Sequence, residues 1–154
     1  MNRQTGAWII LVVFFLFACE GEKKKDRFGH LDYRTKIRLR QYLGEGKRLY
    51  EIHCANCHQA DGAGLARLYP PLKNSDYLLA NRQEVICGMR HGQKGEIIVN
   101  GIMYNMEMPP IPSITDLEIA EIATYIYTEF ADSVHIVTLN DVADIMKNCD
   151  TSAK

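Results

Sequence analysis

The chain has 154 residues, of which 47% are hydrophobic and 24% charged, and its formal net charge is −1. This length fits one domain, and the composition excludes a wholly disordered chain. A nucleic-acid-binding protein would usually carry a concentrated excess of basic residues, so that class is excluded as well.

The first 18 residues have the parts of a secretory signal. Arg3 precedes an apolar run of 12 residues that ends at Ala18, and Cys19 follows. Such a run is too short to cross a bilayer, which needs about 20 residues. Leu16-Phe17-Ala18-Cys19 resembles a bacterial lipobox. The resemblance implies cleavage before Cys19 and a lipid on its thiol, which would place the protein on the periplasmic side of an inner or outer membrane.

Residues 19–38 are expected to form the anchored cysteine and a charged tether. They are polar, they include Lys23-Lys24-Lys25, and they show no apolar period until Ile37. We expect a solvated linker, with a contact between the basic residues and a membrane surface as the alternative.

A folded domain is predicted over residues 39–132, followed by a helical extension over 133–154. Apolar residues recur at offsets of three and four from Leu39 to His53, which predicts an amphipathic helix. Gly46 lies inside this helix, where glycine costs about 1 kcal/mol relative to alanine. Close approach of another helix would explain a glycine there.

Local signals predict the remaining elements. Residues 59–81 are expected to be a loop, and a short helix is expected from Arg82 to His91, ending at Gly92. Asn100-Gly101 separates two apolar runs, a pattern typical of a β-hairpin over residues 96–104. Two further helices are expected, one behind the capping box of Thr115 and Glu118 and one from about Leu139 to Asn148. These elements predict an all-α fold with a small hairpin.

The central motif is Cys54-Ala55-Asn56-Cys57-His58. Cys-x-x-Cys-His is the attachment signature of c-type haem: the two thiols reach the porphyrin vinyl groups and the histidine binds the iron. Three other interpretations are considered. They are a thioredoxin-like dithiol, a disulfide within the motif, and a zinc site that adds Cys87 and His91.

The second axial ligand must come from elsewhere in the chain. Methionine sulfur is a soft, weak donor, so the protein must hold it in place. Met108 is our first choice because two prolines follow it and stiffen the loop. Met106 is the second choice, and a histidine such as His91 is the alternative.

From Leu43 to Phe130 the chain resembles the class I cytochromes c, which carry one haem. Gly46 and Tyr50 are similar to the family's glycine and aromatic residue on the first helix, and Ile122 and Tyr125 are similar to their partners on the C-terminal helix. The resemblance implies that these two helices cross at right angles with Gly46 at the contact. The hairpin and residues 133–154 are additions to the smallest family members.

The resemblance also implies roles around the haem. Pro70-Pro71-Leu72 resembles the family's proline-x-leucine segment, in which the carbonyl of Pro70 would accept a hydrogen bond from Nδ1 of His58 and Leu72 would pack on the haem. Residues 105–110 resemble the axial-methionine loop, with Met108 at the ligand position.

Cys87 and Cys149 are the pair left without a role. In an oxidising compartment such a pair is often a disulfide, and two buried free thiols are the alternative.

We expect an electron carrier that exchanges single electrons with a protein donor and a protein acceptor and turns over no small-molecule substrate. The alternatives are a haem subunit of a larger dehydrogenase or oxidase complex and a five-coordinate haem sensor or peroxidase.

Overall fold

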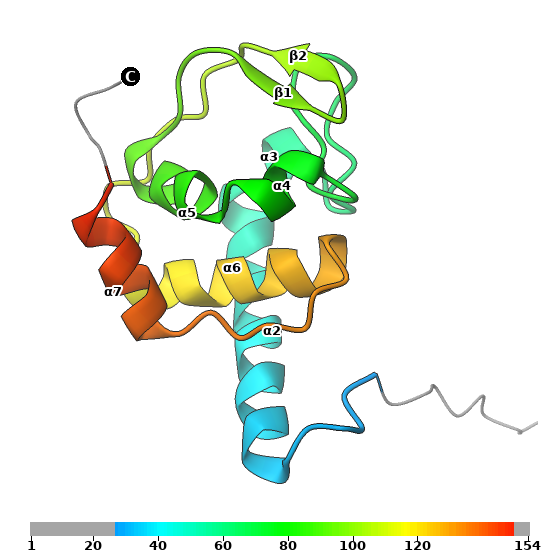
Figure 1. Cartoon of the computed structure of the whole chain (residues 1–154), viewed down its shortest axis with the longest axis vertical. Coiled ribbons are helices and arrows are strands. Elements are labelled where there is room, and N and C mark those ends of the chain that lie inside the picture. Colours follow the sequence, from blue (N-terminus) through cyan, green and yellow to red (C-terminus); the bar gives the residue numbers. More distant parts are fainter. Residues whose placement is uncertain (1–26, 150–154) are drawn as a thin grey trace, which may run out of the picture. The chain divides into compact units, whose positions relative to one another are not determined.

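The computed structural model describes residues 27–149 (Figure 1). The expected signal segment, Cys19 and the Lys23–Lys25 run lie outside the described residues. The chain divides into two units, Met1–Leu31 and Asp32–Lys154. Of the first unit only residues 27–31 are described, and they form a turn in which the amide of Leu31 donates to the carbonyl of Phe28 at 3.0 Å. Everything below concerns the second unit.

The long helix α2 spans Tyr33–His53. It therefore begins six residues before Leu39, inside the segment that we expect to be a tether. The physical reason is an N-cap: the carboxylate of Asp32 accepts hydrogen bonds from the amides of Arg34 and Thr35 at 2.9 and 3.1 Å. Such a cap stabilises a helix start by about 1 kcal/mol without any apolar periodicity in the first turns.

Helix α6, Asp116–Phe130, runs across α2 (Figure 1). Gly46 lies at the crossing, because a Cβ added there would collide with the carbonyl oxygen of Glu121 and lie 2.8 Å from Cβ of Tyr125. This contact is the packing reason that the sequence predicts for the glycine. The rings of Tyr50, Tyr125 and Phe130 pack against one another with centroids 5.3–5.6 Å apart.

Helix α6 is the central element of the core. Its capping box is present as predicted, with Thr115 and Glu118 each bonding the other's backbone amide. Ten of its 15 residues are buried, so it is covered on nearly all sides. The apolar residues of the core that belong to α6 are Ile119, Ala120, Ile122, Ala123, Tyr125, Ile126, Tyr127 and Phe130.

Three short helices and a hairpin lie between α2 and α6 in the chain. They are α3 (Ala55–His58), α4 (Asp76–Ala80), α5 (Arg82–His91), β1 (Ile97–Val99) and β2 (Ile102–Tyr104). Helix α5 ends at Gly92, which has a φ of 75°, as predicted. Helix α4 is a correction to the expected loop over 59–81. Ser75 caps it, but five residues are too few to give a periodic signal.

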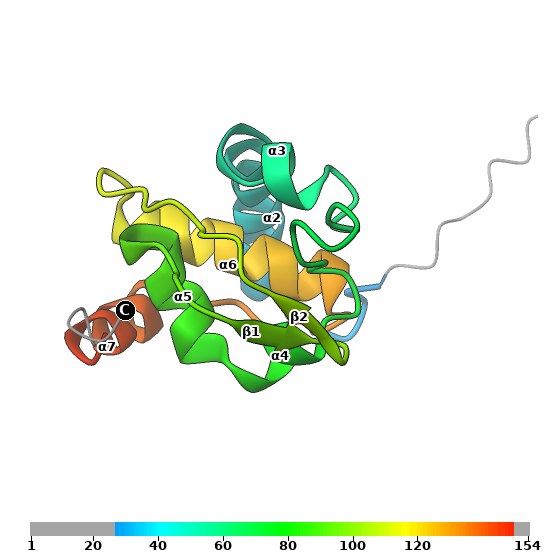
Figure 2. The same cartoon turned by 90° about the horizontal axis from the view of Figure 1, so that it is seen from above.

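The hairpin has the predicted turn. Asn100 and Gly101 have φ values of 51° and 76°, and the antiparallel register pairs Ile97 with Tyr104 and Ile98 with Met103. Positive φ at both turn residues is the conformation that the Asn-Gly pair favours. Strand β1 contacts α4, and Figure 2 shows the hairpin beside that helix.

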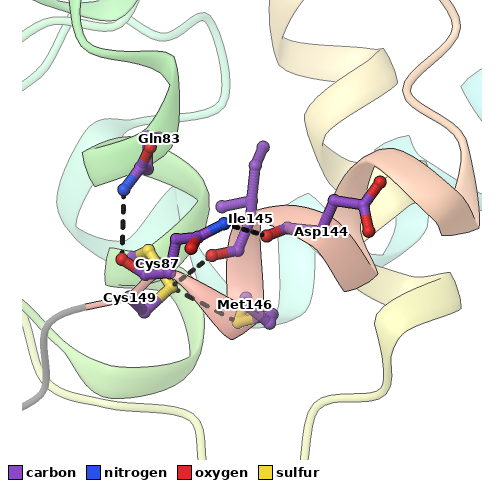
Figure 3. The surroundings of a disulfide bond; sticks show 7 residues. Gln83, Cys87, Asp144, Ile145, Met146 and Cys149 are labelled. Carbon is purple, nitrogen blue, oxygen red and sulfur yellow. Dashed lines mark hydrogen bonds between the residues drawn. A yellow bond between two sulfur atoms is a disulfide. The ribbon is translucent and has the colours of Figure 1, made fainter.

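Helix α7, Leu139–Lys147, packs on α5 and α6. Its capping box joins Thr138 and Asp141, as the sequence indicates. A disulfide between Cys87 of α5 and Cys149 closes the segment, with a Cα–Cα distance of 5.8 Å (Figure 3). The side-chain amide of Gln83 donates to the carbonyl of Asn148 beside it at 3.2 Å. The extension is thus joined covalently to the body of the domain. None of the helices within residues 27–149 is long and apolar enough to cross a bilayer.

Candidate functional site

One largely apolar pocket collects the predicted site residues. Cys54, Cys57 and His58 line it from the junction of α2 and α3, and Met106 and Met108 line it from the loop after the hairpin. The rest of its wall comes from segments far apart in the chain, among them Pro70, Leu72, Val85, Met89, Ile122 and Ile126. The fold therefore places both halves of the expected ligand set in the wall of the same pocket.

A single helical turn presents the motif. Helix α2 ends at Cys54, whose carbonyl accepts hydrogen bonds from the amides of Cys57 and His58 at 3.2 and 2.9 Å. Residues three and four apart lie on the same face of a helical turn, so Cys54, Cys57 and His58 project together. The turn stops at Gln59, which has a φ of 65° and whose carbonyl accepts from the hydroxyl of buried Tyr50 at 2.6 Å. This spacing provides two thiols and one imidazole on the same side of the backbone.

The ring of His58 is fixed by a backbone carbonyl. Nδ1 lies 3.0 Å from the carbonyl oxygen of Pro70, and because a carbonyl only accepts, Nδ1 must carry the proton. Burial lowers the pKa of His58, and the bond to Pro70 opposes that shift only in part. The ring is therefore neutral, and Nε2 carries a free lone pair. This is the state in which imidazole binds a metal, with the partner bond orienting the ring.

Gly64 allows the loop after the motif to bring the carbonyl of Pro70 close to His58. Its φ is 70°, and a Cβ there would lie 2.5 Å from the carbonyl oxygen of Tyr69 and 2.7 Å from the carbonyl carbon of Pro70. Its amide also donates to the carbonyl of His58 at 2.9 Å. The loop after the motif thus folds back closely onto the histidine, at a position where glycine is required.

The Cys54 thiol does not resemble the activated thiol of a reactive dithiol. Burial, together with the neighbouring charge of Cys57, raises the pKa of the Cys54 thiol to about 12. Redox-active Cys-x-x-Cys motifs instead depress the pKa of one thiol, because the thiolate is the nucleophile. Both thiols are free in the structure, so the disulfide within the motif is not formed.

The zinc interpretation also lacks support. It requires Cys87, which is bonded to Cys149 instead. Within residues 27–149 no three histidine, cysteine or acidic side chains gather closely enough to hold a metal ion on their own.

The methionine side of the pocket is attached to the end of α5. Gln93 and Met108 form an isolated antiparallel bridge, with both amide-to-carbonyl distances at 2.9 Å. Gly92 makes room for it, since a Cβ there would lie 2.6 Å from the carbonyl oxygen of Met108. Met108 is half-buried, whereas the side chain of Met106 is 48% exposed. Of the two, Met108 is the better held.

Sequence similarity to known proteins points to the same kind of site. A model of the cytochrome c family matches residues 43–129, more than half of the chain. The chain belongs to the cytochrome c family. It accordingly binds one haem c, joined covalently through cysteine, and its fold is that of a class I cytochrome c with an inserted hairpin. The thiols, the neutral imidazole and the apolar walls of the pocket fit that group.

Parts of this cytochrome are similar in sequence to curated relatives. Cytochrome c-552 of Thermus thermophilus is 33% identical over 93 residues, which cover 58% of this chain and 70% of the relative. A second cytochrome c-552 from the same species is 33% identical over the same length and is covered to 62%. The fructose dehydrogenase cytochrome subunit of Gluconobacter japonicus is 29% identical over 108 residues, but only 22% of its length is matched.

Some pocket residues of the cytochrome are not predictable from the motif. Tyr77 and Gln93 both line the pocket, and the side-chain amide of Gln93 donates to the hydroxyl of Tyr77 at 2.8 Å. Ile97, Val99 and Tyr104 of the hairpin line it as well. The alternation of Ile97 and Val99 with exposed Ile98 was the available signal, because alternate residues of a strand face the same side.

Proposed function

We propose that Cys54 and Cys57 carry the haem thioethers and that His58 and Met108 are the axial ligands of its iron. The observation that supports this is the shared pocket: all four side chains line it, burial keeps His58 neutral, and the carbonyl of Pro70 holds the proton of its ring on Nδ1. When bound, the haem supplies a reversible one-electron change at iron. The assignment of the sixth ligand to Met108 rests on its bridge to Gln93 and on its burial.

The surrounding residues suit electron transfer rather than turnover. Two protein ligands leave no open position for a substrate. Apolar side chains such as Leu72, Ile122 and Ile126 exclude water from the pocket, so little solvent has to reorganise when the charge changes. We therefore propose that single electrons pass through this chain between a protein donor and a protein acceptor of a respiratory chain.

Membrane anchoring is the second part of the proposal. It rests on the signal-like residues 1–18 and on the lipobox-like ending at Cys19. A lipid on Cys19 would hold the cytochrome on the periplasmic side of a membrane. Replacing Cys19 by serine should release the protein from the detergent phase into the aqueous phase after phase separation. A protein that partitions in the same way with and without Cys19 would contradict the anchor.

A fixed subunit of a larger complex is the second candidate function. The observation that favours it is the similarity to the cytochrome subunit of a fructose dehydrogenase. Purification in mild detergent distinguishes the two, because a subunit would elute with an oxidoreductase at constant ratio and a carrier would elute alone.

Haem staining of denatured protein tests the attachment. Cys54→Ala/Cys57→Ala should abolish the stained band, because no thiol remains to form a thioether. Cys87→Ser/Cys149→Ser is the matched control, since it also removes two cysteines but should keep the stain. Equal staining of both variants would refute the proposed roles. Rapid carbon monoxide binding by the reduced wild type would reveal an open iron position and favour the sensor or peroxidase alternative.

A further inference from the structure

The first two turns of α2 are strongly basic. Arg34, Lys36, Arg38 and Arg40 fall within seven residues, and the next acidic residue after Asp32 is Glu45. The carboxylate of Asp32 is already used to cap the helix. Because these residues are helical and not part of a flexible tether, the helix fixes the direction in which each side chain leaves the backbone.

An exposed apolar pair lies between the basic side chains. Tyr33 is 78% exposed and Ile37 is 38% exposed, and their spacing of four places them on one face of the helix. Leu39, which is fully buried, lies about 200° around the axis from Ile37. The Tyr33–Ile37 face therefore points away from the core.

The helical geometry also places the cations. At about 100° per residue, Arg34 and Arg38 fall on one side of the Tyr33–Ile37 face and Lys36 and Arg40 on the other. Arg34, Arg38 and Arg40 are exposed. Figure 1 shows that this half of α2 extends past its crossing with α6, away from α5 and the hairpin.

We propose that the first two turns of α2 form a membrane-contact face that binds anionic phospholipid headgroups. An apolar stripe flanked by Lys and Arg is the pattern of helices that lie in a membrane interface. Each basic residue near an anionic surface strengthens binding about fivefold. A bilayer is favoured over an acidic protein because Cys19 is only 14 residues before Tyr33, a reach of at most about 50 Å. This choice of partner rests on the lipid anchor proposed above.

The contact would orient the cytochrome. Helix α2 has 21 residues and is therefore about 30 Å long, and the attachment motif follows directly at its other end. Binding through Tyr33 and Ile37 would fix which side of the domain rests on the lipid, with Cys54–His58 about 30 Å along the helix from the contact.

A vesicle-binding assay tests the membrane-contact face separately from the lipid anchor. It uses haem-loaded protein that starts at Glu20 and so lacks the lipid. The probes are phosphatidylcholine vesicles with and without phosphatidylglycerol. We expect binding only to the anionic vesicles, and release by high salt because the charges are exposed. Arg34→Gln/Arg38→Gln/Arg40→Gln should weaken binding on the order of 100-fold. Equal binding to neutral and anionic vesicles, or none to either, would overturn the proposal.

Two further variants separate the face from net charge. Arg67→Gln/Lys73→Gln/Lys147→Gln removes the same number of cations outside α2 and should leave vesicle binding unchanged. Tyr33→Ser/Ile37→Ser keeps every charge and should weaken binding about tenfold through lost apolar burial. An equal loss in the charge-matched control would refute a localised face. Absorption spectra are recorded for each variant, so lost vesicle binding with an intact haem spectrum would leave the electron-carrier function standing.

Discussion

Replacing Gly46 by alanine should separate the two helices that build the core. An added Cβ would collide with the carbonyl oxygen of Glu121, and it would lie 2.7 Å from the carbonyl carbon of Glu121 and 2.8 Å from Cβ of Tyr125. Ordinary contact begins near 3.4 Å. Backbone atoms cannot rotate away as a side-chain end can, so α2 and α6 must part by at least about 0.7 Å.

The magnitude follows from two opposing effects. Overpacking of this kind costs about 1–3 kcal/mol, and a rigid backbone contact belongs at the upper end. Alanine recovers about 1 kcal/mol because it is a better helix former than glycine. We expect Gly46→Ala to lose about 2 kcal/mol of unfolding free energy. At a denaturant dependence of about 2 kcal/mol per molar, the urea midpoint falls by about 1 M.

Gly44 supplies the matched control in the same helix. A Cβ at Gly44 would meet nothing within 4 Å, so Gly44→Ala should gain about 1 kcal/mol by propensity alone. The measurement is urea unfolding of both haem-loaded variants by far-ultraviolet circular dichroism. Equal midpoints for Gly46→Ala and Gly44→Ala would refute the close helix crossing.

Three further predictions concern the site and the extension. Met108→Ala should abolish the weak long-wavelength sulfur-to-iron band of the oxidised protein and lower its reduction potential, whereas Met106→Ala should change neither; the reverse result would move the ligand to Met106. Cys87→Ser/Cys149→Ser should lose up to about 4 kcal/mol in urea unfolding, because the disulfide closes a loop with a sequence separation of 62, and an unchanged midpoint would show that the bond does not constrain the chain. The hydrogen bond from the backbone amide of Thr138 lowers the pKa of Asp141 below its ordinary value of 3.8. The ionised carboxylate therefore stabilises α7 fully at pH values above 3.8, and this stabilisation is lost as the pH falls through the lowered pKa. Asp141→Asn should therefore be less stable than the wild type at neutral pH, with a gap that closes in strong acid, and a gap independent of pH would contradict the ionic cap.

Elements with a local signal were predictable from the sequence. The end of α5 at Gly92, the Asn100-Gly101 turn and the two capping boxes each depend on a few adjacent residues, whose conformational preferences are intrinsic. Such signals survive in almost any tertiary environment. The helical turn Ala55–His58 that carries the motif was not predicted, because four residues give no periodic signal.

Features that depend on distant partners were not predictable. The first turns of α2 are a different case: they lack apolar periodicity, but the adjacent Asp32 cap is a local signal that could have indicated them. The bridge between Gln93 and Met108 joins two loops, and no pattern within either loop specifies the other. The part of the candidate site that holds the methionine is therefore the part that required the three-dimensional arrangement.

The hairpin would exclude water from one side of a bound haem. Ile97, Val99 and Tyr104 line the pocket, and the hydroxyl of Tyr104 donates to the carbonyl of Ala66 at 3.3 Å. These side chains would keep water away from a bound haem, which would destabilise the more highly charged oxidised iron and raise the reduction potential. Two cytochromes with identical attachment motifs would thus differ in reduction potential if only one of them had this hairpin.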